Sequence, residues 1–237
     1  MNTEDKNRTA HQNKTPWGLV FLLFGAGVLS ACQVGKAPPV LPDIRMDLNV
    51  SLFYAGWILS IFNFTGLMLG TSAGIIADTI GHRRLMLTGF ILQIAGSVFG
   101  SFSLSFPMLL CARFLEGTGF LSVIVSTPTL IFQQVASKDM KVALSVWSCY
   151  LPAGAASMMV LIPFINTMTG WRGLWLINAM ILTAYGALLY FKTRKITFNR
   201  SSESGRGITG MVKDIVHTST RPGPFLLAFI FIVYSLQ

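Results

Sequence analysis

Long apolar runs separated by short polar segments restrict the fold of this chain more than any other feature. A helix needs about 20 mostly apolar residues to cross the hydrocarbon core of a bilayer, because each residue advances about 1.5 Å. Six runs approach or exceed this length, over residues 17–41, 52–77, 85–102, 107–135, 142–165 and 173–191. The pattern predicts an all-α integral membrane protein, with a six-transmembrane-helix bundle over residues 17–192.

Charged residues are few and lie mainly between the apolar runs. They make up 11% of the sequence, whereas a typical soluble domain carries about 25%. The formal net charge of +9 would suit nucleic acid, but the Lys and Arg residues cluster in the connecting segments. If the N-terminus lies inside, the inner segments hold fourteen of them and the outer segments three. This asymmetry follows the positive-inside rule, so we expect a cytoplasmic N-terminus, the lipid bilayer as partner and no nucleic acid.

The two ends of the chain differ from the bundle in composition. Residues 1–16 are polar and basic and predict a cytoplasmic tail. Residues 193–222 are basic and rich in Ser and Gly, which is typical of a cytoplasmic linker. Residues 223–237 begin a seventh apolar run that is too short to cross a bilayer. We therefore expect a truncated seventh transmembrane helix, and a fragment or truncated gene product.

Several ionisable and polar residues fall inside the apolar runs. Arg113, Glu116 and Gly117 share one helix face because of their spacing. A charged residue at membrane depth is costly unless it is paired or faces a cavity, so we expect Arg113 and Glu116 to line a cavity or to form a structural ion pair. The remaining candidate solute contacts are Gln33, Lys36 and Asn63. Lys36 would either snorkel to the interface or join Arg113 in favouring an anionic solute, and Asn63 would bond a neighbouring helix or the solute.

Small residues and a proline suggest where helices approach and bend. Gly66, Gly70 and Gly74 recur every four residues and predict a close helix seam. Pro152 followed by Gly154 predicts a helix kink in the fifth run, either static or used in a rocking motion. No phosphate-binding loop, paired catalytic carboxylates or metal-ligand spacing is present in the sequence. We therefore expect neither an enzyme nor a cofactor or metal.

A short polar turn between the second and third runs carries the most specific motif. The turn holds Gly74, Ala77, Asp78, Gly81 and Arg83. These residues match the loop between helices two and three of the major facilitator superfamily. From residue 17 onward, this sequence resembles that family. The resemblance implies that Gly74, Asp78, Gly81, His82, Arg83 and Arg84 form a cytoplasmic gating loop. Thr79 and His82 stand where the family usually has Arg, which implies a weaker or pH-sensitive clamp. From the residues alone, Gly81 would supply a positive φ, and Arg83, Arg84 or a helix N-terminus would compensate Asp78.

A second stretch, from Leu109 through Arg113, Glu116 and Gly117 to Gly119, is similar to the family's motif in helix four. The resemblance gives Arg113 a role in proton coupling, and Glu116 stands where family members often carry Gln. Trp171, Arg172 and Gly173 also resemble the family, less specifically.

The resemblance implies the N-terminal half of a transporter that carries a small solute by alternating access, with a proton as coupling ion. It also implies a multi-pass protein of the bacterial inner (plasma) membrane that needs a C-terminal half. The alternative is a truncated, transport-incompetent half-transporter or a membrane interaction protein. A reading frame that continues in apolar runs beyond Gln237 would favour transport.

Overall fold

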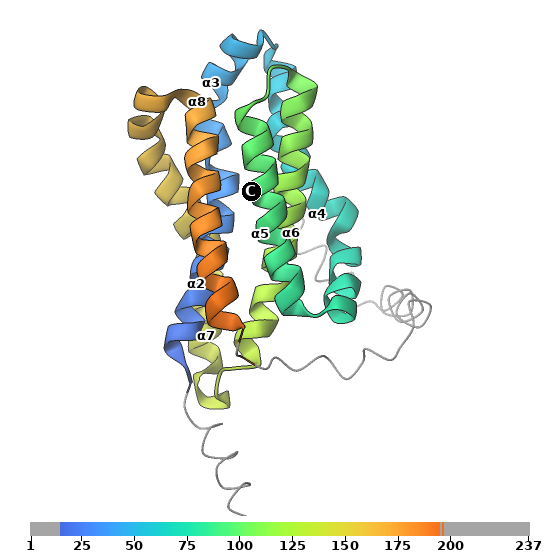
Figure 1. Cartoon of the computed structure of the whole chain (residues 1–237), viewed down its shortest axis with the longest axis vertical. Helices are drawn as coiled ribbons and strands as arrows, with labels where there is room; N and C mark the ends of the chain where they lie inside the picture. The colour runs from blue at the N-terminus through green and yellow to red at the C-terminus, as the bar shows by residue number, and fades with distance from the viewer. Residues whose placement is uncertain (1–14, 195, 197–237) are drawn as a thin grey trace, which may run out of the picture. The chain divides into compact units, whose positions relative to one another are not determined.

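The protein is described here by a computed structural model that covers residues 15–194 and 196 (Figure 1). The regular elements of this part of the chain are all helical. They are α2 (Trp17–Gly35), α3 (Ala37–Leu48), α4 (Leu52–Ile80), α5 (His82–Ser101), α6 (Phe106–Phe132), the 3-10 helix η1 (Ser137–Asp139), α7 (Met140–Ser148) and α8 (Tyr150–Thr193). The prediction of an all-α membrane bundle is confirmed. The expected tail, linker and seventh helix lie outside the described residues, except for the few at their edges.

The described helices account for all six predicted runs. Five helical stretches are long and apolar enough to cross a membrane, and the last of these, Ser137–Thr193, has 57 residues. It holds two predicted runs because α8 turns back at Gly170, whose φ of 67° and ψ of 175° are not helical. Residues before Gly170 contact α2 from Gly27 to Gly35, and residues after it return along α5. The two arms of α8 are therefore separate crossings.

Prolines set the end of the first helix. Pro38 and Pro39 lack the N–H groups that would continue the helical hydrogen bonds, so α2 ends at Gly35 and α3 begins after Lys36. The first run was expected to reach residue 41 as one element. Instead α3 continues to Leu48 and lies at one end of the bundle (Figure 1). We call this the α3 end, and the opposite end, at the turn between α4 and α5, the Gly81 end.

The fifth run bends close to the predicted place. The break falls at Cys149, between α7 and α8, which is three residues before Pro152. This offset is expected because the missing N–H of a proline frees a carbonyl four residues earlier. Gly154 is not the bend itself. It lies against the Val28 carbonyl and Ala31 of α2, where a side chain would collide.

Close helix contacts occur on a different helix from the one predicted. A Cβ atom at Gly66, Gly70 or Gly74 would meet no described atom within 4 Å, so the expected seam on α4 is wrong for this part of the chain. The seam lies instead between α5 and α6. A Cβ at Gly89 would come within 2.7 Å of the Gly119 carbonyl, and one at Gly119 within 2.5 Å of the Gly89 carbonyl.

Two apolar clusters fill the interior, one toward each end. The cluster toward the Gly81 end includes Leu23, Met86, Phe90, Val123 and Leu182. The cluster toward the α3 end includes Ile44, Ile58, Leu109, Leu174 and Trp175. Between the two clusters along the bundle axis lie buried polar side chains from α2 and its C-cap, α5 and α6. We call this set the polar layer. Its members are Ser30, Gln33, Lys36, Gln93, Ser97, Arg113 and Glu116.

Candidate functional site

One carboxylate joins two cations inside the polar layer. The Lys36 Nζ lies 2.6 Å from Glu116 Oε1, and the Arg113 Nη1 lies 2.7 Å from Glu116 Oε2. The three side chains expose 1% of their surface or less. Each carboxylate oxygen therefore has its own cationic partner. We call Lys36, Arg113 and Glu116 the charged triad.

The local structure of three helices positions the charged triad. Arg113 and Glu116 lie one turn apart on α6, so their side chains meet on one face. Arg113 also donates to backbone carbonyls of two other helices, at 2.9 Å to Gln33 of α2 and 3.3 Å to Ile58 of α4. Gln33 lies in the last turn of α2, where carbonyls lack helical partners. Arg113 thus ties α6 to α2 and α4.

Ser97 on α5 completes the network from a fourth helix. Its hydroxyl donates to Glu116 Oε1 at 2.8 Å and accepts from Lys36 Nζ and the Gln33 side-chain amide, each at 3.0 Å. One donor and two acceptor positions are all that a serine hydroxyl offers. The sequence interpretation missed Ser97 because a single serine in an apolar run carries no signal of its own.

Aromatic rings cover the two cations. The Lys36 Nζ lies 4.5 Å from the centroid of the Trp175 ring, and the Arg113 guanidinium lies 4.6 Å from that of Phe62. Such placements add cation–π attraction, which is strongest where water is excluded. Trp175 comes from the second arm of α8. The aromatic cover and the four-helix network make this the most elaborated polar site in the described bundle.

Glu116 carries the single negative charge of the triad. With Glu116 ionised, the triad carries one net positive charge and every carboxylate oxygen is paired. Protonation of Glu116 would leave two buried cations with no counter-charge, which favours separation of Lys36 or rehydration. A buried carboxylate between two cations is therefore sensitive to any conformational change that admits water.

Several predicted site residues lie elsewhere than expected. Lys36 does not snorkel to the interface, because the proline-induced turn aims it inward and its side chain is fully buried. Arg113 and Glu116 form the ion pair that was the alternative to a cavity lining, and both side chains are buried. Gly117 contacts Thr65 and Phe62 of α4, so its role here is close packing. Asn63 is exposed on α4.

The predicted gating turn forms a compact structure at the Gly81 end. Gly81 has a φ of 95°, as expected, and separates α4 from α5. His82 Nε2 lies 3.5 Å from the Asp78 carboxylate, one helical turn before it. Arg83 instead donates to the Thr193 hydroxyl at 3.0 Å and covers the Tyr190 ring at the end of α8. Arg84 is exposed.

The family model for the Major Facilitator Superfamily matches residues 23–236. Among curated proteins, the probable actinorhodin transporter of Streptomyces coelicolor is 27% identical over 73% of this chain and 31% of its own length. The multidrug resistance protein Stp of Mycobacterium tuberculosis is 28% identical over 79% of this chain and 33% of its own length. The galactose-proton symporter of Escherichia coli K12 is 22% identical over 76% of this chain and 39% of its own length. The chain thus spans about a third of the length of the first two relatives.

Proposed function

The chain belongs to the major facilitator superfamily, and from this premise we propose that it supplies one six-helix half of a proton-coupled secondary transporter for a small solute. Transporters of this kind place the solute near the membrane midplane between two halves that rock against each other. The membership itself supports transmembrane transport. A further set of about six helices would come from a downstream segment or a second chain.

The buried Glu116 is the observation that carries the proton-coupled part of the proposal. An ionisable residue at membrane depth marks a proton or ion pathway by default. Glu116 is fully buried, and Lys36 and Arg113 hold it from two helices. In the proposed cycle, opening of the bundle hydrates Glu116, which takes up a proton and releases Lys36. The relative named galactose-proton symporter supports proton coupling.

The excess of cations in the triad supports an anionic solute. When Glu116 is protonated, the Lys36 ammonium is free to bind a carboxylate or another anion, and the Gln33 amide lies beside it through Ser97. The solute would then replace Glu116 as the partner of Lys36. Asn63 on the exposed side of α4 remains a third candidate contact. Return of the proton from Glu116 would restore the ion pair and expel the solute.

The Gly81 end is proposed as the cytoplasmic gate. Its candidate residues are Gly74, Asp78, Gly81, His82, Arg83 and Arg84. The beginning of α2 lies toward the same end (Figure 1), and just before it Thr15 accepts from the Ala136 backbone and donates to Asp139 of η1. The excess of Lys and Arg in the segments on this side supports a cytoplasmic location for this end, by the positive-inside rule. The proposed membrane is the bacterial inner membrane.

The second candidate is a half that does not transport and serves as a membrane interaction protein. The observation that favours it is the completeness of the network: Arg113 ties three helices and Ser97 uses every hydrogen-bonding position. A purely structural ion cluster would look the same in one conformation.

Solute-driven proton movement separates the two candidates. The protein would be expressed from its complete natural reading frame, and vesicles containing it would be loaded with a pH-sensitive dye. They would be exposed to actinorhodin and to galactose, the solutes in the names of two relatives. We expect at least one to move protons, and Arg113→Ala and Asp78→Asn to abolish or reduce the effect. Lys141→Ala, an exposed cation on α7, is the control. Unchanged transport in both variants would refute the site assignments, and no proton movement in the parent would favour the second candidate.

A further inference from the structure

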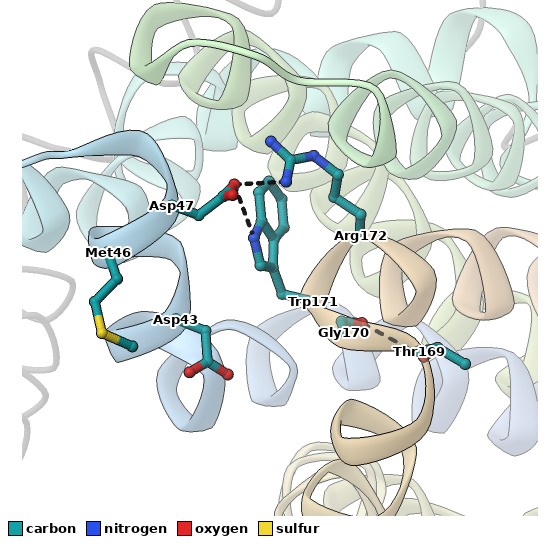
Figure 2. Close-up of a pocket in the computed structure, with 7 residues that line it drawn as sticks. All are labelled: Asp43, Met46, Asp47, Thr169, Gly170, Trp171 and Arg172. Atoms are coloured by element: carbon teal, nitrogen blue, oxygen red, sulfur yellow. Dashed lines mark hydrogen bonds and ion pairs between the residues drawn. The ribbon is translucent and has the colours of Figure 1, made fainter.

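An open pocket lies at the α3 end, outside the charged triad. It has a volume of about 580 Å³ and lies between α3 and the turn of α8 at Gly170 (Figure 2). Its lining combines carboxylates, an indole and a guanidinium: Asp43, Met46, Asp47, Thr169, Gly170, Trp171 and Arg172. Because the pocket is open, it is accessible to water.

Two tryptophans connect this pocket to the charged triad. Trp171 lines the pocket yet is only 5% exposed, and its ring meets the ring of Trp175 edge-on at 5.7 Å. Trp175 is fully buried, and the Lys36 Nζ lies 4.5 Å from the centroid of its ring. Trp175 also fits against Gly100, where a Cβ atom would lie 2.6 Å from the indole. The two rings therefore lie in series between water and Lys36.

Buried polar atoms beside the triad lack partners among the described residues. They include the Trp175 Nε1 donor and the side-chain carbonyl oxygens of Gln93 and Asn178. The contacts of Gly100 with Trp175 and of Gly186 with Phe90 fix the register of α5 against α8. This register places Asn178 at the height of Ser97. Buried polar groups without partners are commonly satisfied by internal water, so the layer has hydrogen-bonding capacity for water once water can reach it.

Trp171 is held in place from the pocket side by one carboxylate. The Asp47 carboxylate accepts from Trp171 Nε1 at 3.2 Å and from Arg172 Nη1 at 2.5 Å (Figure 2). Arg172 in turn donates to the Ser103 carbonyl at 2.9 Å and stacks over Trp171 at 4.4 Å. Asp43 lines the same pocket but bonds the Asn166 amide instead. Asp47, unlike Asp43, therefore restrains the Trp171 ring directly.

We propose that Trp171 and Trp175 form an aromatic gate between the pocket and the polar layer, with the Asp47–Arg172 pair as its latch. When the latch opens, the rings swing apart and water from the α3 end reaches Ser97, Lys36 and Glu116. The gate deepens the proposed function by giving Glu116 a route for protons. The role of the gate as a proton route rests on the proposed function. The opening itself does not, because solvent access is measurable without transport.

Cysteine accessibility tests the gate directly. Cys32, Cys111 and Cys149 are replaced by Ala or Ser, Ser97→Cys is introduced as probe, and its reaction with a small water-soluble methanethiosulfonate is followed by mass spectrometry. Asp47→Ala should speed the reaction about tenfold or more, because it removes a charge-assisted hydrogen bond that holds the closed state. Asp43→Ala is the matched control and should leave the rate unchanged. Equal rates in the two variants, or rapid reaction in the parent, would overturn the proposal.

A second readout requires no probe cysteine. Hydroxyl radicals generated from water label buried side chains only where water comes close, so labelling of Trp175 in the otherwise native chain reports the same opening. It should rise in Asp47→Ala and stay at the parental level in Asp43→Ala. Labelling that is equal in all three proteins would contradict the gate even if the Ser97→Cys chain failed to fold. Loss of transport with normal gating would count against the proposed function alone.

Discussion

Lys36 and Glu116 lie 80 positions apart in the sequence, and their side chains form a fully buried ion pair of 2.6 Å. The pair joins the end of α2 to the middle of α6, where Arg113 binds the other carboxylate oxygen of Glu116. Removal of one partner from such a site leaves an uncompensated charge out of water. The order of destabilisation in variants of the triad therefore follows from charge balance.

Glu116→Leu should be the most destabilising change in the triad, because it leaves Lys36 and Arg113 buried without a counter-charge. We expect a loss of about 3–5 kcal/mol. Lys36→Met should cost less, since the Arg113–Glu116 pair remains neutral and the methionine fills a similar space. Thermal unfolding of the purified variants in detergent measures the order. A larger loss for Lys36→Met than for Glu116→Leu would show that charge balance does not govern the site.

The contact between α5 and α6 predicts a glycine-specific effect. Gly119→Val should destabilise the bundle by about 1–3 kcal/mol or more, the usual cost of overpacking, because its Cβ would come within 2.5 Å of the Gly89 carbonyl. Gly70→Val on α4 is the control, since no described atom lies within 4 Å of its Cβ position. Detergent-extracted yield and unfolding temperature report both. A similar loss of stability in Gly70→Val and Gly119→Val would contradict the prediction, because it would mean that α4 also makes a close contact at Gly70.

The contact between His82 and Asp78, which lie 3.5 Å apart, predicts that charge at the gating turn affects transport. His82→Arg places a permanent positive charge beside the carboxylate and should slow transport by stabilising the closed gate. Asp78→Asn removes the partner, so the double variant should not show this slowing. The uptake rate is compared in the parent, the two single variants and the double variant. An unchanged rate in His82→Arg would exclude a role for His82 in the gate.

The all-helical membrane bundle followed from the sequence because hydrophobic length is a local property. The same holds for the Arg113–Glu116 pair, whose spacing of three residues brings the side chains together on any helix. The positive φ of Gly81 was also predictable, because a tight turn between two helices requires it.

The partners of Lys36 could not be predicted in the same way. Whether Lys36 snorkels outward or turns inward depends on the break made by Pro38 and Pro39 and on the rotation of α2 against α6. Glycine spacing was ambiguous for a similar reason. Gly66, Gly70 and Gly74 have the more regular repeat, but Gly89 and Gly119 face each other because α5 and α6 are neighbours with that register. Such contacts are decided by tertiary structure.

The most direct test of the central claim separates proton movement from solute exchange in Glu116→Gln. The amide keeps the size of the side chain and cannot carry a proton, so net proton-driven solute flux should be lost while exchange of labelled for unlabelled solute across the vesicle membrane continues. Asp43→Asn, the same change outside the polar layer, should retain both. Net proton-driven flux in Glu116→Gln equal to that of the parent would contradict the account.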